Sequence, residues 1–288
     1  EAFAASLGLD ASQVLAVNGS DEALNFAFMA FGKELAFPDI SYGFYPVLAA
    51  LNHIPYTEIP LREDLRLAPE DYFELHRMIV IANPNAPTGL SVQPDSIREM
   101  LTRCPDRMHV IDEAYVEFVK DVDMATAIPL TRKYDNLIVL RSVSKFFAAP
   151  GLRFGYAITA NEDFLNAAAN GKTPWNVNTF ACVAGIMFED EHYINLTRSL
   201  IQTERNLIFS AMSTRKTIKV FKPDTNFILI KLLKEEQTAS DVFDYCIQKG
   251  LMIRDCSDYE GLGSKYVRFC FLKPEQNDNM VNTILEIV

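Results

Sequence analysis

The residues best suited to chemistry in this 288-residue chain stand at the ends of short apolar runs. Ser142, Ser144 and Lys145 end the run that begins NLIVLR, and Arg153 follows eight residues after the lysine. Hydroxyls and an arginine can bind a phosphate group, because they supply hydrogen-bond donors and a planar cation. A lysine beside them can form a Schiff base with an aldehyde. The spacing therefore predicts an anion site with a reactive amine next to it.

Two other apolar runs end in polar residues of a complementary kind. Asp112 ends the run MHVID and can pair with a protonated ring nitrogen, while the phenol of Tyr115 can reach the same ligand. Ser20 and Asp21 follow the run VLAV and begin a helical pattern, where free backbone N–H groups favour an anion. Plain helix capping explains Ser20 and Asp21 equally well, so this signal is weak by itself.

The elements that must position these residues alternate between apolar runs and helical patterns. The expected strands are 14–17, 34–39, 77–84, 108–114, 136–142 and 154–159, and the expected helices are 21–31, 42–51 and 95–103. Runs with few charges are typical of strands buried on both faces. The alternation predicts an α/β fold with an open, mostly parallel sheet and helices on both faces. Ligands bind beyond the carboxyl ends of such strands, where these residues stand.

The pattern changes after about residue 160. Helices are expected at 163–170, 179–188, 190–212, 239–249 and from Pro274 onward, and strands at 218–221, 227–232, 252–256 and 267–271. We therefore expect a large domain over 1–189 and a smaller α+β domain over 190–288.

Composition excludes several classes of function. The net charge of −11 opposes binding to nucleic-acid phosphates. No apolar run reaches the roughly 18 residues of a membrane-spanning helix. The five cysteines and four histidines lack the spacing of metal ligands, so no metal site is expected. The first residues do not resemble a secretory signal, and we expect a cytoplasmic protein with reduced thiols.

Three motifs in this order resemble the fold-type I pyridoxal-phosphate enzymes of the aminotransferase class I/II family. They are NPNAPTG (83–89), DEAYVEF (112–118) and SVSKFFAAPGLRFGY (142–156), and the resemblance covers nearly the whole chain. It implies the aspartate aminotransferase-like fold of pyridoxal-phosphate-dependent transferases, with pyridoxal 5'-phosphate as cofactor. It also implies a homodimer in which the partner subunit completes the site.

The resemblance assigns roles to individual residues. Lys145 would hold the cofactor covalently and shuttle protons, Asp112 would pair with the pyridine nitrogen, and Tyr115 would hydrogen-bond the ring oxygen. Tyr42 would stack on the ring. The residues implied around the cofactor phosphate are Ser20, Asp21, Ser142, Ser144 and Arg153.

The resemblance also implies a substrate-binding group in the second half of the chain. Arg268 would grip a carboxylate with help from Asn226, and Arg254 would meet a phosphate or another anionic group. Either arginine could instead be a surface residue of an edge strand.

The chain departs from the family pattern in three places. Ala86 stands where the family has an asparagine that contacts the ring oxygen, and Asn85 or Tyr115 are the candidates to replace that contact. The family's N-terminal portion is not in the sequence. The connection across 31–33 is also shorter than expected, so we expect segments there that the sequence omits.

Two reactions and one non-catalytic role remain open. The segments SKFFAAPGLRFGY, TPWNVN (173–178) and 252–269 are most similar to threonine-phosphate decarboxylases. The segments 36–51 and NPNAPTG are more similar to histidinol-phosphate aminotransferases. The leading hypothesis is an enzyme that acts on a small phosphorylated amino acid or amine, most like the decarboxylase, with transamination as the alternative. A silent cofactor-binding regulatory module is disfavoured, because it has no chemical need of Lys145 and Asp112.

Overall fold

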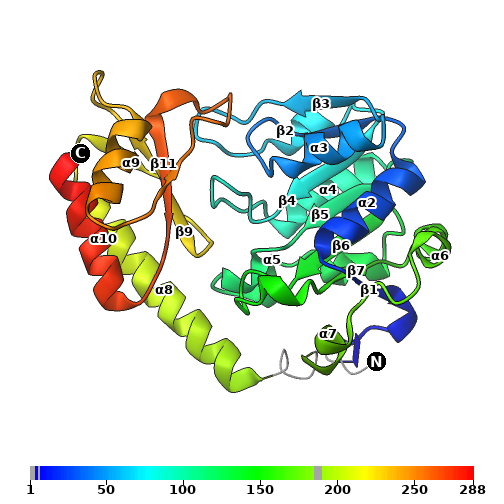
Figure 1. The fold of residues 1–288 in the computed structure, drawn as a ribbon. Helices are drawn as coiled ribbons and strands as arrows, with labels where there is room; N and C mark the ends of the chain where they lie inside the picture. The colour runs from blue at the N-terminus through cyan, green and yellow to red at the C-terminus, as the bar shows by residue number, and fades with distance from the viewer. Residues whose placement is uncertain (1–3, 6, 185–189) are drawn as a thin grey trace.

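The larger part of the molecule is built on a seven-stranded sheet (Figure 1). The computed structural model describes residues 4–5, 7–184 and 190–288. The strands are β1 (Val14–Val17), β2 (Leu35–Pro38), β3 (Tyr56–Ile59), β4 (Met78–Ala82), β5 (His109–Asp112), β6 (Leu137–Ser142) and β7 (Gly155–Ile158). Their order is β1-β7-β6-β5-β4-β2-β3, and among these described strands the two pairs that contain β7 are antiparallel while the others are parallel. The mostly parallel sheet that the sequence predicts is therefore present.

Helices cover both faces of this sheet because its central strands are apolar on both sides. Side chains such as Val80 and Val110 pack with α2 (Ser20–Phe31), α3 (Phe44–Leu51) and α6 (Glu162–Gly171). The alternate side chains, such as Ile79 and Ile111, pack with α4 (Pro94–Arg103) on the other face. The strands are thereby fixed from both sides, and their carboxyl ends open at one edge of the sheet.

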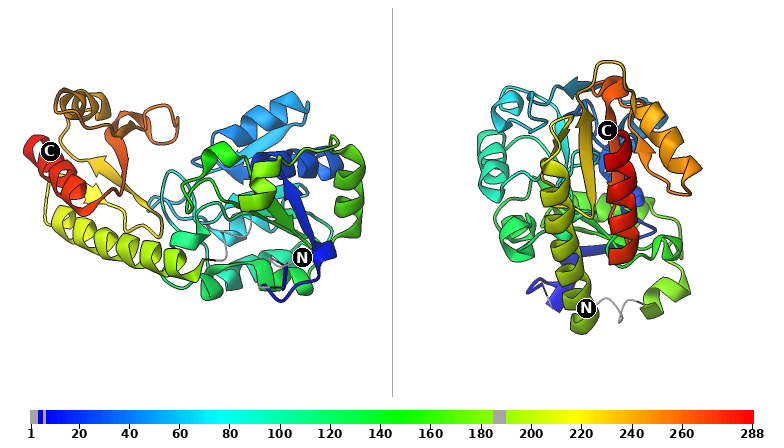
Figure 2. Two further views of the ribbon diagram at one scale, coloured as in Figure 1. Left: turned by 60° about the horizontal axis from the view of Figure 1, so that its bottom comes forward. Right: turned by 90° about the vertical axis from the view of Figure 1, so that its left-hand side faces the viewer.

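The smaller part is a four-stranded antiparallel sheet backed by helices, as expected for the second domain. Its elements are α8 (Glu191–Ser213), β8 (Ile218–Val220), β9 (Phe227–Leu232), α9 (Ala239–Gln248), β10 (Arg254–Asp255), β11 (Tyr266–Cys270) and α10 (Pro274–Ile287). Strand order is β10-β11-β9-β8. The long helix α8 leads from the large domain to this sheet, as Figure 2 shows from two further sides.

Most expected elements are present with their ends shifted by no more than two residues, and three differences remain. The edge strand β3 was not predicted, because its sequence YTEI mixes polar and apolar residues and its side chains are mostly exposed. The strand expected at 252–256 is only the two-residue β10. Of the helix expected at 179–188, α7 (Thr179–Ala184) is present, and residues 185–189, with the expected domain boundary, lie outside the described residues.

The connection across 31–33 closes tightly in the structure. Residues 32–34 join α2 to β2, and the Gly32 N–H donates to the Phe28 carbonyl at 2.8 Å. A Cβ at Gly32 would lie 2.5 Å from that same oxygen, so a side chain does not fit there. Among the described helices, none combines the length and apolar character needed to cross a membrane.

Candidate active site

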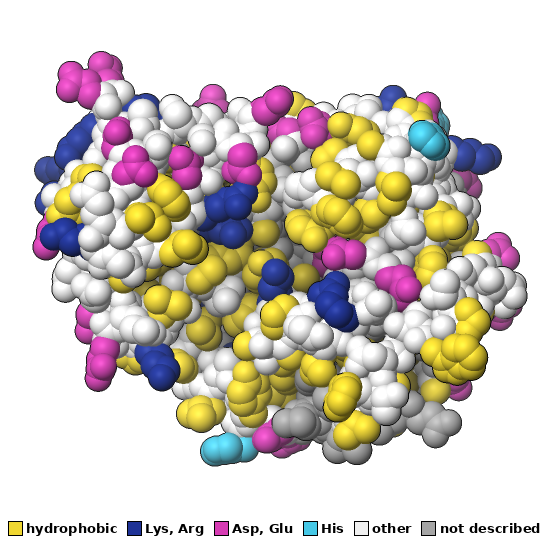
Figure 3. Space-filling model, viewed as in Figure 1, with side chains coloured by type: hydrophobic (Ala, Val, Ile, Leu, Met, Phe, Trp, Pro, Cys, Tyr) yellow, Lys and Arg dark blue, Asp and Glu magenta, His cyan; other side chains and the backbone are white. Residues whose placement is uncertain are grey.

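A pocket of about 330 Å³ lies where the carboxyl ends of β4, β5 and β6 face the small domain. Figure 3 shows Lys and Arg side chains in and beside the hollow between the two parts of the molecule. Most of the predicted site residues line this pocket: Ser20, Asp21, Tyr42, Asp112, Tyr115, Ser142, Ser144, Lys145, Arg153, Arg254 and Arg268. Residues up to 248 positions apart in sequence thus meet at one place.

Asp112 is the buried carboxylate of the pocket. It ends β5, and its Oδ1 accepts a hydrogen bond from the Ala114 N–H at 3.1 Å. Its Oδ2 accepts one from the Tyr45 hydroxyl at 3.2 Å. Burial raises the pKa of Asp112 to about 6. Neither hydrogen-bond donor carries a positive charge, so a cationic ring nitrogen in the pocket would stabilise the ionised carboxylate.

Two tyrosines of the α3 region flank this carboxylate. Tyr42 precedes α3, lines the pocket, and donates to Asp21 Oδ1 at 3.3 Å. Tyr45 is fully buried, and its ring meets that of Tyr42 edge-on at 5.4 Å between centroids. The prediction of the site omitted Tyr45. Its spacing of three residues from Tyr42 in a helical pattern was the available signal.

The N-terminus of α2 forms a cradle for an anion together with three side chains. Gly19 adopts φ +84°, and a Cβ there would lie 2.5 Å from an Arg153 guanidinium nitrogen. The guanidinium therefore rests directly against the first turn of the helix, beside Ser20. Ser142 and Ser144 line the same pocket, and Ser142 donates to Ser144 at 2.9 Å. Helix N–H groups, hydroxyls and an arginine together suit a phosphate group.

Lys145 and Tyr115 lie between this cradle and the small domain. The Lys145 Nζ is 5.6 Å from the centre of the Tyr115 ring. The Tyr115 ring meets Phe227 of β9 edge-on at 5.2 Å. Burial raises the pKa of Tyr115 to about 12, so its hydroxyl remains a hydrogen-bond donor at neutral pH. The amine and the phenol can thus reach one ligand that is anchored in the cradle.

The small domain contributes two arginines side by side. Arg254 and Arg268 are directly opposite residues of β10 and β11. Arg254 pairs with Asp258, and the Arg268 guanidinium lies 4.6 Å from the centre of the Phe227 ring. The Arg268 Nε is shielded from solvent and has no hydrogen-bond partner among the described residues. Like charges on directly opposite residues repel. Asp258 offsets this charge for Arg254, and Arg268, which has no ion pair among the described residues, favours an anionic substrate group.

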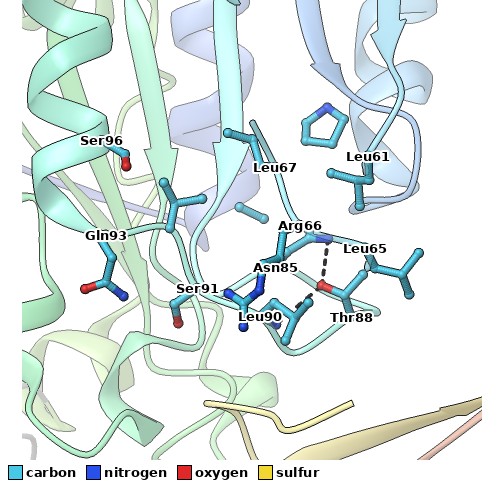
Figure 4. Close-up of a pocket in the computed structure, with 13 residues that line it drawn as sticks. Leu61, Leu65, Arg66, Leu67, Asn85, Thr88, Leu90, Ser91, Gln93 and Ser96 are labelled. Atoms are coloured by element: carbon cyan, nitrogen blue, oxygen red, sulfur yellow. Dashed lines mark hydrogen bonds between the residues drawn. The ribbon is translucent and has the colours of Figure 1, made fainter. Parts of the chain in front are cut away.

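The structure does not bring Asn85 or Asn226 into the pocket wall. The Asn85 side chain accepts from Ser41 at 2.8 Å and donates to Ile40 O at 2.8 Å and Thr88 Oγ1 at 3.1 Å. It faces a second hollow behind the 83–89 loop (Figure 4), so it does not replace the contact missing at Ala86.

Three further residues lie in or near the pocket: Ala86, Asn226 and Tyr259. Ala86 itself lines the active pocket, and Tyr115 therefore remains the candidate partner of the ring oxygen. Asn226 precedes Phe227, and its Oδ1 is shielded without a partner among the described residues. Tyr259 lines the pocket beside the arginines although the sequence analysis gave it no role.

Comparison with known proteins identifies the class. The family model described as "Aminotransferase class I and II" matches residues 1–284, so the chain belongs to this family of pyridoxal-phosphate-dependent enzymes. It is 32% identical to histidinol-phosphate aminotransferase of Brachyspira hyodysenteriae, over 97% of this chain and 78% of that protein. The matched stretches cover 59% to 79% of the relatives' own length.

Two solved structures show the same fold over 99% of this chain and 86% of their own. The histidinol-phosphate aminotransferase of Clostridium acetobutylicum has a TM-score of 0.92 at 27% identity. The L-threonine-O-3-phosphate decarboxylase of Porphyromonas gingivalis has a TM-score of 0.85 at 25% identity. The predicted family, fold and cofactor class are confirmed.

The residues of the pocket fit pyridoxal phosphate. Gly19 lets the Arg153 guanidinium lie against the first turn of α2, and this cation beside the free N–H groups of the helix suits the phosphate. Buried Asp112, with its raised pKa, suits a protonated pyridine nitrogen. Lys145 is the amine that can bond the aldehyde.

Proposed function

We propose that the chain is an aminotransferase acting on a small phosphorylated amine of the histidinol-phosphate type. The observation that carries the proposal is an amine, Lys145, in one pocket with two separate anion sites. One site, at Gly19 and Arg153, matches the cofactor phosphate. The other, formed by Arg254 and Arg268, is left for an anionic group of the substrate.

The relatives favour transamination over the decarboxylation that the sequence analysis placed first. The histidinol-phosphate aminotransferase structure is the more similar of the two described above, both in fold and in sequence. Decarboxylation stays the second candidate because Arg268 can also hold a carboxylate with its planar fork. Both reactions use the same part of the pocket, the part at the strand ends with Asp112 and Lys145.

The chain's own residues divide the work between them. When bound, pyridoxal phosphate supplies an aldehyde and a ring that accepts electrons from the substrate's α-carbon. Asp112 would keep the ring nitrogen protonated, and Tyr115 would donate a hydrogen bond to the ring oxygen. The Nζ of Lys145 would remove the α-proton of the substrate and hold it for transfer. Arg254 and Arg268 orient the substrate by its anionic group, which decides the bond that breaks.

A homodimer is part of this proposal. Phe44, Val47 and Leu51 of α3 are exposed apolar side chains, and Tyr42, just before this helix, lines the pocket. Burying them against a second subunit would remove this apolar surface from water and enclose the pocket. Light scattering of the purified protein tests the expected mass of two chains.

The activity assay separates the two reactions. Protein loaded with pyridoxal phosphate is given histidinol phosphate with 2-oxoglutarate in one sample and O-phosphothreonine in another. Glutamate from the first supports transamination. Carbon dioxide from the second alone contradicts it and supports the decarboxylase, and neither product contradicts both.

A further inference from the structure

Helix α8 holds the two large-domain segments that follow the catalytic residues. Arg198 of α8 pairs with Glu117 Oε2 at 3.0 Å and also donates from Nε to the Glu117 carbonyl at 3.2 Å. Its guanidinium carbon lies 5.8 Å from the centre of the Phe146 ring. Glu117 is two residues beyond Tyr115, and Phe146 directly follows Lys145. One side chain of α8 thus contacts both segments.

Glu117 also joins this contact to the interior of the sheet. Its other carboxylate oxygen accepts from Arg141, whose side chain is almost fully buried. Arg141 pairs with fully buried Glu113 at 3.0 Å and donates to Thr126 Oγ1 at 2.9 Å. Glu113 and Arg141 adjoin Asp112 and Ser142 in sequence. The ion-pair network therefore lies directly behind the strand ends that form the pocket.

More contacts along α8 strengthen the same connection. Arg205 donates to the Phe118 carbonyl at 2.7 Å, and Tyr193 donates to the Phe146 carbonyl at 3.4 Å. The rings of Phe118 and Phe146 belong to the same buried cluster as the apolar side chains of α8 and of the small sheet. The core of the small domain thus extends to the segments behind the pocket.

The length of α8 makes these contacts decisive for the substrate arginines. A 23-residue helix is about 35 Å long, so a tilt of about 5° at one end moves the other end by about 3 Å. The sheet with Arg254 and Arg268 packs on α8, and Figure 1 shows α8 reaching from the large domain to that sheet. Holding the first half of α8 in place therefore fixes the arginines relative to Lys145.

We propose that Glu117 and Arg198 are positioning residues that fix the small-domain arginines relative to Lys145. They act through α8 and touch neither cofactor nor substrate. The proposal rests on the proposed function in that Arg254 and Arg268 bind the substrate anion. It predicts that loss of this ion pair weakens substrate binding and leaves cofactor binding unchanged.

The test compares Arg198→Met, Glu117→Gln and the double variant in the full chain loaded with pyridoxal phosphate. The matched control is Arg103→Met, because Arg103 also has an ion pair, with Glu99 at 2.8 Å, and an aromatic contact, with Phe73 at 4.6 Å. We expect KM for histidinol phosphate to rise about 10-fold in each single variant, with kcat changed less than about 3-fold. Cofactor affinity and the control variant's KM should not change.

The double variant tests whether Glu117 and Arg198 act together, and amide hydrogen exchange tests whether they hold the segments behind the pocket. If the pair acts as one unit, the double variant should be no worse than either single variant. Amide exchange should quicken at 115–120 and 146–149 in both single variants but not in the control. Unchanged KM and exchange, or a loss of cofactor affinity with KM intact, overturns the proposal.

If wild-type protein shows no turnover of histidinol phosphate, the proposed function fails by itself, and exchange in the variants still decides this inference. Arg198→Lys, which keeps the charge but loses the planar fork, replaces Arg198→Met if the latter fails to fold.

Discussion

The two halves of the pocket are built in different ways. The half at the strand ends is built around a buried carboxylate, since Asp112 is only 8% exposed and held by two hydrogen bonds, although Lys145 and Arg153 are themselves exposed. The half on the small domain is open to solvent, and the Arg254 side chain is 50% exposed. A cofactor that stays bound needs a fixed, dry site, whereas a substrate must enter and leave. Changes in the two halves should therefore affect different measured quantities.

Loss of Lys145 should produce the largest effect. Lys145→Ala removes the amine that bonds the cofactor and moves the α-proton, so turnover should fall at least about 10³-fold. Borohydride trapping followed by mass spectrometry should show cofactor on Lys145 in wild type and none in the variant. Lys219→Ala is the control, since Lys219 also lies over an aromatic ring, that of Phe221 at 5.0 Å. Turnover that survives Lys145→Ala would refute the enzyme proposal.

Asp112→Asn should separate activity from stability. In the cofactor-free fold the pKa of Asp112 is about 6, above its ordinary 3.8. Between about pH 4 and pH 6 the Asp112 carboxyl is protonated in the folded protein but ionised in the unfolded chain. The free energy of unfolding of the wild type therefore falls as the pH rises through this range. Asparagine does not titrate, so at pH 7 the variant should be up to about 3 kcal/mol more stable.

Urea unfolding of both cofactor-free proteins at pH 4 and pH 7 measures this difference. The variant should also lose activity, because asparagine offers the ring nitrogen no negative charge. A gain in stability that is equal at both pH values would contradict the assignment to Asp112.

Arg268→Leu should weaken substrate binding at the small-domain half of the pocket and leave cofactor binding at the strand ends unchanged. A charge-assisted hydrogen bond to an anion contributes about 1.5–3 kcal/mol, so KM for the phosphorylated substrate should rise about 10- to 100-fold. Cofactor affinity, measured by absorbance titration, should stay constant. Arg254→Leu should have a smaller effect, since Arg254 is more exposed and already paired with Asp258. Equal losses of cofactor binding in both variants would show that the two halves are not independent.

Tyr45→Phe should have the smallest effect. The hydroxyl stabilises the ionised form of Asp112 through its 3.2 Å hydrogen bond, worth about 1 kcal/mol. Its removal should raise the pKa of Asp112 further, and the stability change described above should move to higher pH. Tyr134→Phe is a control, because that hydroxyl bonds Thr102 on the surface. An unmoved pH profile would show that Tyr45 only fills space.

The sequence predicts the buried half of the pocket better than its surroundings. Lys145, Asp112 and Ser142 end apolar runs, and parallel strands place their carboxyl ends together by necessity. Strand β3 escaped prediction because an edge strand needs no continuous apolar run. The expected role of Asn85 depended on the direction of one side chain in a loop, which neighbours in sequence do not determine.

In the sequence by itself, apolar periodicity determined the fold class and the residues at the strand ends, and the resemblance carried by three motifs determined the family and with it the cofactor. The tertiary structure decided which side chains from distant parts of the chain meet: Tyr45 on Asp112, Arg268 on Phe227, and Arg198 on Glu117. These contacts join residues 41 to 81 positions apart. They depend on how helices and sheets pack together, which no local pattern in the chain specifies.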